Sequence, residues 1–340
     1  MPYANLFGKD LITVKDWTFE ELESVFELAK MLKINRSQGE MPEYLDKKTF
    51  HMLFYHTSTR TRNSFEAAVT ELGGHAHYLR PTELQLHVGE SVKDTAGVLG
   101  RYGQGIGVRV YTTDLEGEPY GAGDRTIREY AQWADVPVIN MCTDSYHPCQ
   151  HMADLMTIRE KVHRYVGKKF VFSWAYNPRV RRPCNGSDIT WLMPRYGIDY
   201  VLAHPKGYEL DPEVIELAKK YAAESGSSFE ISYDMKEAME GAHFVYALDW
   251  VSVKLYRDYG KNGFAQDKEI RDKHKDWIVN QEMIDRCDKN VLYLHPLPAA
   301  RGTEVTDEVI DGPHSVILDE AENRLHIQKA ILASTMHRAI

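Results

Sequence analysis

Short apolar runs and longer amphipathic runs alternate along most of the chain. The first amphipathic run follows Thr18-Phe-Glu-Glu21, a pattern typical of a helix N-terminus whose free N–H groups are capped by side chains. Apolar residues recur at helical spacing from there to Leu32, which predicts a helix. An apolar run at 50–55 then predicts a strand, and an amphipathic run at 63–72, stopped by Gly73-Gly74, predicts a second helix.

The same alternation continues along the chain and predicts a fold of the α/β class. Further strands are expected at 75–79, 107–111, 136–141, 170–175, 200–204, 229–232, 244–248 and 291–295, with helices between them and a last helix from about 320. Because such alternation is typical of parallel sheets covered on both faces, we expect two doubly wound parallel-sheet domains. The pattern restarts after residue 150, so the expected domains are 1–150, completed by a C-terminal helix at 321–340, and 151–320.

Composition narrows the class of protein. With 340 residues, 43% hydrophobic and 27% charged, the chain is expected to be globular. Its net charge of -9 argues against nucleic acid or an anionic membrane as a partner, since both attract basic surfaces. No apolar run approaches the roughly 18 residues of a membrane span, no signal-peptide pattern stands at the start, and the four cysteines are scattered. We therefore expect a cytoplasmic protein with reduced thiols.

The strand at 50–55 runs into a loop rich in hydroxyls and arginines, His56-Thr-Ser-Thr-Arg-Thr-Arg62, and then into a helix. Backbone N–H groups at a helix N-terminus, the helix dipole and guanidinium groups all favour a phosphate at such a place. The simpler alternative is an ordinary serine or threonine helix cap beside two surface arginines.

Two further segments follow predicted strands of the first half. Arg109 lies toward the end of the strand predicted at 107–111. From there it can reach a ligand at the carboxyl edge of the sheet, although such an arginine is usually solvated. His147-Pro-Cys-Gln150 follows the strand at 136–141, where the imidazole can stabilise charge on a carbonyl oxygen and the glutamine amide can both donate and accept. A metal site from the nearby cysteines and histidines is the alternative, but its spacing fits no usual zinc pattern.

Three polar features remain. His295-Pro-Leu-Pro298 follows the last predicted strand, and its prolines fix backbone carbonyls, as they also do in a simple rigid turn. Arg324 opens the last helix beside acidic residues that could serve as ion-pair partners. Gln85 lies in a polar loop, where a lone glutamine mostly faces water.

The segment Ser58-Thr-Arg-Thr-Arg62, followed by Ser64-Phe-Glu66, resembles the carbamoyl-phosphate loop of the aspartate and ornithine carbamoyltransferase family. The later motifs follow in the family's order, so the resemblance covers nearly the whole chain. It implies an enzyme that moves the carbamoyl group of carbamoyl phosphate to the amino group of a small amino-acid-like acceptor, an ornithine derivative or related diamino compound, and releases phosphate. It implies no cofactor and no metal. It also implies a homotrimer with shared active sites, because the family's loop at Gln85 enters the neighbouring subunit's site.

The resemblance assigns roles to individual residues. The 1–150 domain would bind carbamoyl phosphate and the 151–320 domain the acceptor. Arg109, His147 and Thr61 would polarise the carbonyl as catalytic residues. The full set expected to contact carbamoyl phosphate is Ser58, Thr59, Arg60, Thr61, Gln85, Arg109, His147, Gln150, Arg324 and the main-chain oxygens of Pro296 and Leu297.

The acceptor segments differ from those of the ornithine branch. That branch carries Asp-x-Trp-x-Ser-Met, whereas this chain has Leu248-Asp-Trp250-Val-Ser252-Val, with leucine in place of the first aspartate. The second half is most similar to the N-acetylornithine and N-succinylornithine carbamoyltransferases, which implies a backbone knot at 177–185. Glu304 stands where the acetylornithine enzyme has a lysine, and His151 where it has an acidic residue. We expect these residues, His151, Leu248, Trp250, Ser252 and Glu304, to line a less basic acceptor pocket, either unchanged in specificity or suited to a different acceptor.

The sequence also bears on two other classes of function. A nucleotide-dependent enzyme on a similar fold is disfavoured, because no Gly-x-Gly-x-x-Gly or Gly-Lys-Ser/Thr loop follows a predicted strand. A non-catalytic relative that binds carbamoyl phosphate, or serves as a regulator, stays open as the alternative.

Overall fold

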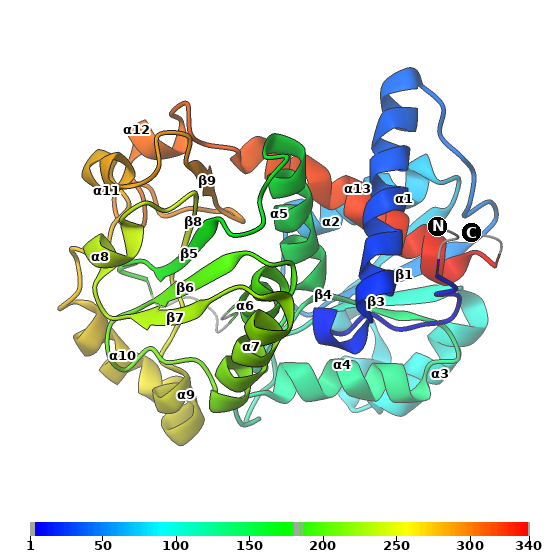
Figure 1. Ribbon diagram of the computed structural model, residues 1–340. Helices are drawn as coiled ribbons and strands as arrows, with labels where there is room; N and C mark the ends of the chain where they lie inside the picture. The colour runs from blue at the N-terminus through cyan, green and yellow to red at the C-terminus, as the bar shows by residue number, and fades with distance from the viewer. Residues whose placement is uncertain (1–3, 180–183, 185, 339–340) are drawn as a thin grey trace. The chain divides into compact units, whose positions relative to one another are not determined.

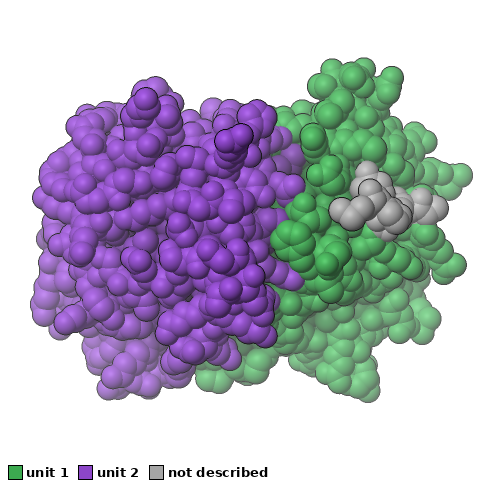
Figure 2. All heavy atoms as spheres, in the orientation of Figure 1, with its two compact units in different colours: residues 1–153, 322–340 green, residues 154–321 purple. Residues whose placement is uncertain are grey.

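The computed structural model describes residues 4–179, 184 and 186–338. The chain forms two compact units, coloured separately in Figure 2. Unit 1 comprises residues 1–153 and 322–340, and unit 2 comprises residues 154–321. None of the helices in the described part of the chain is both long enough and apolar enough to cross a membrane.

Unit 1 is built on a four-stranded parallel sheet with the strand order β2-β1-β3-β4 (Figure 1). The strands are β1 (Thr49–Phe54), β2 (His75–Leu79), β3 (Gly105–Arg109) and β4 (Val138–Cys142). Strands β1, β3 and β4 are almost entirely buried, as parallel strands covered on both faces must be. Their carboxyl ends lie at one edge, where an open α/β sheet binds its ligands.

Two groups of helices accompany this sheet. One group is α1 (Phe19–Gln38), α2 (Arg60–Glu71) and α13 (Ile317–Met336); the other is α3 (Val92–Tyr102) and α4 (Ala122–Trp133), and α5 (Pro148–Lys161) follows β4. Ion pairs from Glu71 of α2 to Arg36 of α1 (2.9 Å) and Lys329 of α13 (2.8 Å) join the first group. Short 3-10 turns occur at Val14–Asp16, Pro81–Glu83, Gln85–Val88 and Thr112–Asp114.

The start of α1 shows how local sequence sets an element boundary. The Thr18 hydroxyl accepts from the Glu21 N–H at 3.2 Å, and the Glu21 carboxylate accepts from the Thr18 N–H at 2.8 Å. This reciprocal cap satisfies two of the N–H groups that a helix start leaves without intrahelical partners. The helix ends at Gly39, whose φ of 78° is a left-handed conformation that glycine adopts without strain.

Unit 2 contains a five-stranded parallel sheet with the strand order β7-β6-β5-β8-β9. Its strands are β5 (Lys169–Trp174), β6 (Asp199–Ala203), β7 (Phe229–Ser232), β8 (Phe244–Leu248) and β9 (Leu292–Leu294). The helices are α6 (Ser187–Arg195), α7 (Pro212–Ser225), α8 (Met235–Met239), α9 (Val253–Tyr259), α10 (Gly263–Arg271), α11 (Gln281–Arg286) and α12 (Asp307–Ile310), with a 3-10 turn at Gly260–Asn262. The chain passes between the units within α5 and within α13.

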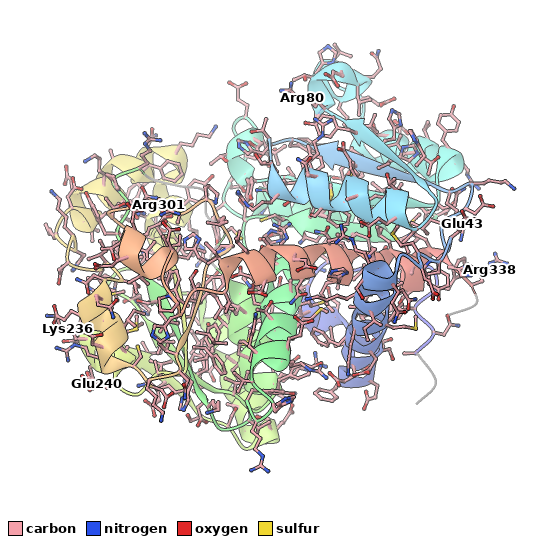
Figure 3. The ribbon with its side chains drawn as sticks, turned by 90° about the horizontal axis from the view of Figure 1, so that it is seen from above. Glu43, Arg80, Lys236, Glu240, Arg301 and Arg338 are labelled. Carbon is pink, nitrogen blue, oxygen red and sulfur yellow. The ribbon has the colours of Figure 1, made fainter. Side chains whose placement is uncertain are left out.

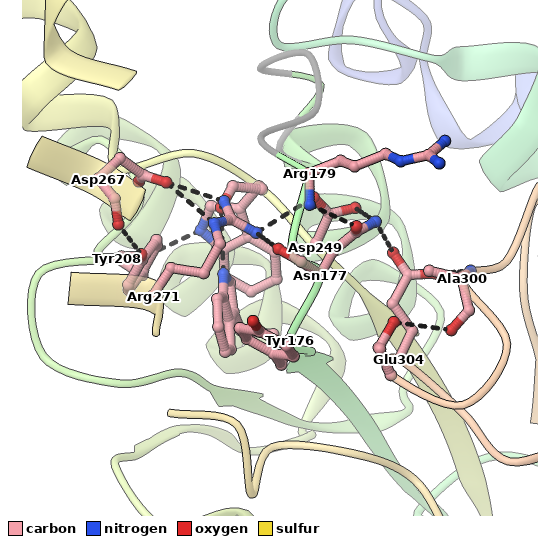
Figure 4. Close-up of polar contacts among 12 residues, drawn as sticks. Tyr176, Asn177, Arg179, Tyr208, Asp249, Asp267, Arg271, Ala300 and Glu304 are labelled. Atoms are coloured by element: carbon pink, nitrogen blue, oxygen red, sulfur yellow. Dashed lines mark hydrogen bonds and ion pairs between the residues drawn. The ribbon is translucent and has the colours of Figure 1, made fainter. Parts of the chain in front are cut away.

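A fully buried ion cluster, drawn in Figure 4, organises the carboxyl end of β8. The Arg271 guanidinium lies 3.3 Å from the Asp249 carboxylate and 3.0 Å from the Asp267 carboxylate, and all three side chains are inaccessible to solvent or nearly so. It also donates to the main-chain oxygens of Asn177 and Trp250 at 3.3 and 3.1 Å. With two carboxylates and two carbonyls around one cation, the charge of Arg271 is more than compensated inside the unit.

The predicted fold class, two parallel-sheet α/β domains of the carbamoyltransferase type, is confirmed. The ends of the predicted strands lie within one or two residues of those observed, and the last strand, β9, is one residue shorter at each end than predicted. The predicted knot depends on residues 177–185, and residues 180–183 and 185 lie outside the described residues. The knot and the functional assignment of the two domains therefore stay predictions.

Replacing Arg271 with methionine should destabilise the protein by about 3–5 kcal/mol, because it leaves two carboxylates buried without their cation. The free energy of unfolding can be measured by urea denaturation. The matched control is Lys220→Met on α7, which removes an exposed partner of Glu224 and should cost less than about 1 kcal/mol. Equal losses in the two variants would contradict a stabilising role for the cluster.

Candidate active site

The candidate site in unit 1 begins in the first turn of α2, directly after β1. Thr61 is buried there, and its N–H donates to the Ser58 hydroxyl at 3.2 Å. Thr59 is the residue before the helix, and its side chain makes no capping hydrogen bond to the helix start. The short hydroxyl-rich loop thus leads into a helix N-terminus, whose dipole favours an anion.

The Thr61 hydroxyl is the meeting point of two arginines that are far apart in the sequence. Arg324 donates to the Thr61 oxygen at 2.7 Å from α13, and Arg109 lies 3.4 Å from the same oxygen at the end of β3. The same Arg109 nitrogen also donates to the Met141 carbonyl at 3.2 Å. The structure therefore brings together three residues that the sequence predicted to bind one ligand.

His147 is buried next to this positive charge. Burial lowers the pKa of His147 well below its usual range, and the positive charges of Arg324 and Arg109, with smaller contributions from His151 and Arg60, lower it further. The imidazole is therefore neutral at neutral pH. A neutral imidazole can donate one hydrogen bond to a carbonyl oxygen without being deprotonated by the basic acceptor.

The two arginines of the loop have different surroundings. Arg62 stacks on Tyr78 with its guanidinium carbon 3.7 Å from the ring centre, and it pairs with Glu66 at 2.9 Å on the same helix. Arg60 contributes to the positive potential at His147. Arg62 thus braces α2, and the contact of Arg60 with a ligand stays a prediction.

The loop that carries His147 starts from a strained backbone. Cys142 ends β4 with a φ of 142°, a conformation that costs a non-glycine residue about 1–3 kcal/mol. Side chains hold it there: Asn140 accepts from the Cys142 N–H at 2.8 Å, and the Tyr111 hydroxyl contacts the Cys142 sulfur at 3.0 Å. The cysteine at this place therefore serves the geometry of the loop.

The remaining predicted residues of unit 1 lie on α5 and in the 80–90 loop. Gln150 and His151 are buried, and their N–H groups donate to the His147 carbonyl as α5 begins. The rings of His151 and His147 are 6.4 Å apart. Gln85 is exposed and starts a 3-10 turn. The roles assigned to these three side chains stay predictions.

In unit 2, the loop after β9 is shaped by a histidine and a glutamate. The His295 Nδ1 accepts from the Leu297 N–H at 2.9 Å, so the neutral ring carries its proton on Nε2, 3.4 Å from the buried Glu304 carboxylate. Leu297 has a φ of 49°, so the hydrogen bond from its N–H supports a left-handed conformation. This arrangement fixes the direction of the Pro296 and Leu297 carbonyls.

Glu304 is held by several donors (Figure 4). It accepts from the Ala300 N–H at 2.5 Å and from the Asn177 amide at 3.1 Å. Arg301, which follows Ala300 and is labelled in Figure 3, is exposed. It pairs with Asp307 and Asp311, both at 2.6 Å. The guanidinium beside Ala300 is therefore engaged on the surface of unit 2.

The segment after β8 is anchored by the side chains of Asp249, Trp250 and Ser252. Asp249 faces Arg271, the Trp250 indole donates to the Tyr208 carbonyl at 2.9 Å, and the Ser252 hydroxyl accepts from the Leu255 N–H at the start of α9. Leu248, directly before them, is partly buried. Trp250 and Ser252 thus have structural partners, and their predicted contact with an acceptor stays a prediction.

Arg271 was not among the predicted residues, because nothing in its local sequence distinguishes it from a surface cation.

Residues 9–160 match the family model described as the carbamoyl-phosphate-binding domain of aspartate/ornithine carbamoyltransferase, and residues 186–335 match that of its Asp/Orn-binding domain. The ornithine carbamoyltransferase of Pyrococcus horikoshii is 42% identical over 330 residues, which cover 97% of this chain and 96% of that enzyme. The chain belongs to the aspartate/ornithine carbamoyltransferase family, and it is a carbamoyltransferase.

Solved structures agree with this assignment. The ornithine carbamoyltransferase of Pyrococcus furiosus superposes with a TM-score of 0.86 at 40% identity, covering 98% of each chain. An acetylornithine transcarbamylase complexed with acetylcitrulline superposes with a TM-score of 0.88 at 32% identity, covering 96% of this chain and 99% of that one. Both branches to which the sequence pointed are therefore among its structural relatives.

Replacing Thr61 with valine should lower kcat/KM for carbamoyl phosphate by roughly 10- to 100-fold, since it removes an acceptor of charge-assisted hydrogen bonds from Arg324 and Arg109. Phosphate release in the presence of an acceptor measures the effect. Thr70→Val, at an exposed position of the same helix, is the control and should behave like the wild type. If Thr61→Val lost no more than the control, the hydroxyl would have no role in the site.

Proposed function

We propose that this carbamoyltransferase moves the carbamoyl group of carbamoyl phosphate to an ornithine-like diamino acid and releases phosphate, with Thr61, Arg109, His147 and Arg324 at the reacting centre. The observation that carries the proposal is the convergence of Arg109 and Arg324 on one hydroxyl beside a neutral histidine. Excess positive charge around an uncharged donor suits a dianionic phosphoryl group joined to a polar carbonyl.

The proposed reaction is an acyl-type transfer. Ser58, Thr59, Arg60, Thr61 and Arg324 hold the phosphate at the start of α2. Arg109 and His147 then donate to the carbamoyl oxygen as a neutral amine attacks the carbon, so that the negative charge of the tetrahedral intermediate is stabilised. Phosphate leaves with the electron pair of the broken bond and takes up the proton that the attacking nitrogen loses, and the guanidinium groups stabilise the charge of the phosphate. Most of the rate then comes from positioning and electrostatics.

The proposal that the acceptor is ornithine-like rests on relatives, and the end of β8 bears on which ornithine-like compound it is. Relatives named ornithine carbamoyltransferase are 40–42% identical over nearly the whole chain, and the acetylornithine transcarbamylase is 32% identical. Leu248 replaces the aspartate of the ornithine branch, and Asp249 cannot substitute for it, because its carboxylate is committed to Arg271. His151 and Glu304 complete the proposed acceptor residues, and the Pro296 and Leu297 carbonyls accept from the reacting amine or amide.

Assembly and location belong to the same proposal. A homotrimer with shared active sites is supported by the exposure of Gln85 in a loop at the edge strand of the unit 1 sheet, where a neighbouring chain can be reached. A cytoplasmic location is supported by the small number and scattered positions of Cys142, Cys149, Cys184 and Cys287, which do not form the disulfide framework typical of small secreted domains.

The proposal is tested by phosphate release from carbamoyl phosphate with ornithine, N-acetylornithine, N-succinylornithine, putrescine and aspartate as acceptors. We expect turnover with an ornithine-type acceptor, abolished by Arg109→Met. Release with aspartate alone would contradict the acceptor. Binding of carbamoyl phosphate without release in any mixture would favour the non-catalytic alternative.

Leu248→Asp should raise kcat/KM for free ornithine by at least about tenfold, if an aspartate at this position pairs with the charged end of the acceptor. Leu248→Asn is the control, because it has the same shape without the charge. The ratio of ornithine to N-acetylornithine turnover measures the change. A rise in both variants, or in neither, would contradict an electrostatic role of this position in selecting the acceptor.

A further inference from the structure

Two carboxyl groups outside the predicted site, Asp124 and Asp144, are built into the loop that carries His147. Asp144 is fully buried and lies between β4 and α5. Its carboxylate accepts from the Thr112 N–H at 2.8 Å, from the Thr112 hydroxyl at 2.6 Å and from the Gly123 N–H at 2.9 Å. One side chain therefore joins the loop after β4 to the loop after β3 and to the first turn of α4.

Thr112 extends this connection. Because its hydroxyl donates its single proton to Asp144, its oxygen is an acceptor, and the Ala122 N–H donates to it at 2.8 Å. Position 123 has room only for glycine: an added Cβ would lie 2.7 Å from the Asp144 carboxylate oxygen and 2.7 Å from the Val110 carbonyl oxygen. The close approach of backbone and carboxylate is thus a specific feature of this junction.

Asp124 holds the other side of the same loop. Its carboxylate accepts from the Ser145 N–H at 3.2 Å and is hydrogen-bonded by the Thr143 and Ser145 side chains. The loop also closes on itself, since the Thr143 N–H donates to the Tyr146 carbonyl at 2.9 Å. The two carboxyl groups together restrain residues 143–146, and the next residue is His147.

We propose that Asp124 and Asp144 are positioning residues that hold the 143–147 loop, and with it His147, in the geometry required for carbamoyl transfer. The inference rests on the proposed function of His147. Neither carboxyl group is assigned contact with substrate, so both act through the loop. An imidazole displaced by about 1 Å from a reacting oxygen costs on the order of 100-fold in rate.

The two groups also make the junction sensitive to pH. Burial raises the pKa of Asp144 to about 7, and the negative charge of Asp124 adds to the shift; burial likewise raises the pKa of Asp124. Arg128 of α4 is a cation near Asp124, and the hydrogen-bond partners described for the two carboxyl groups are hydroxyl and N–H donors. Asp144 therefore keeps its proton at slightly acid pH and releases it as the pH rises past about 7.

The sign of the effect follows from proton linkage. The native state binds protons that the unfolded chain, with an ordinary aspartate pKa near 3.8, has already released. The stabilisation is complete below the unfolded value and is lost as the pH rises through about 7. In this window the folding equilibrium constant should fall by up to about tenfold per pH unit for each proton.

The first test is Asp144→Asn in the full-length protein. At pH 7 we expect kcat to fall by about 10- to 100-fold with KM for carbamoyl phosphate changed less than about threefold, because His147 acts mainly in the transition state. Thr112→Val should reproduce the loss, and Thr112→Ser, which keeps the hydroxyl, should restore activity. Asp135→Asn, at an exposed partner of Arg101, is the control.

A second measurement does not depend on turnover. Amide hydrogen exchange of the 140–151 segment should speed up at least about tenfold in Asp144→Asn while the rest of unit 1 stays protected. Between pH 5 and 8, Asp144→Asn should also lose part of the wild type's decline in stability. Wild-type exchange and an unchanged pH slope in Asp144→Asn would overturn the proposal. If the wild-type protein released no phosphate with any acceptor, the proposed function would fail, and exchange would still decide whether the loop is held by these carboxyl groups.

Discussion

The Thr61 hydroxyl, with Arg324 and Arg109 at 2.7 and 3.4 Å, is the contact on which the rest of the site depends. Two guanidinium groups repel each other, so they converge only where a firm framework holds them and an acceptor lies between them. The framework is visible: Arg109 ends a buried strand, and Arg324 lies on a helix whose Lys329 is paired with Glu71 of α2. Burial, and then the positive charge of Arg324 and Arg109, lower the pKa of His147 and keep it neutral. Under the proposed function, the same positive charge attracts the phosphate of the substrate.

In unit 2, by contrast, the buried charged groups have partners within the unit. Arg271 is compensated by two carboxylates and two carbonyls, and Glu304 accepts from Ala300 and Asn177. The polar residues after β8 and β9 therefore define backbone positions. Under the proposed function, the Pro296 and Leu297 carbonyls and the Leu248 side chain remain to contact the acceptor, and Leu248 is the position at which this chain departs from the ornithine branch.

The sequence was sufficient for the α/β alternation, for most strand positions and for the loop after β1, because these depend on periodicity and on motifs read over a few residues. Thr61, Arg109, His147 and Arg324 were found by motif, and the first three lie after strands whose carboxyl ends share an edge. Asp144, Asp124 and Arg271 were not found, because a buried aspartate or arginine has the same local sequence as an exposed one. Burial and partners arise from tertiary packing: Thr112 and Asp144 are 32 positions apart, and Arg271 is 94 positions from Asn177.

The central claim is that a neutral His147, surrounded by arginines, faces the carbamoyl group. The most direct test is the ring NMR signal of His147, identified by its loss in His147→Asn, followed from pH 5.5 to 8 with and without carbamoyl phosphate. We predict that the His147 signal stays that of the neutral ring over this range, because burial and the arginines lower the pKa of His147. We also predict that the signal shifts when carbamoyl phosphate is added. The partly exposed His243 of unit 2 should not respond to the ligand. A His147 that titrates with an ordinary pKa near 6.5, and whose signal does not change at saturating carbamoyl phosphate, would contradict the account.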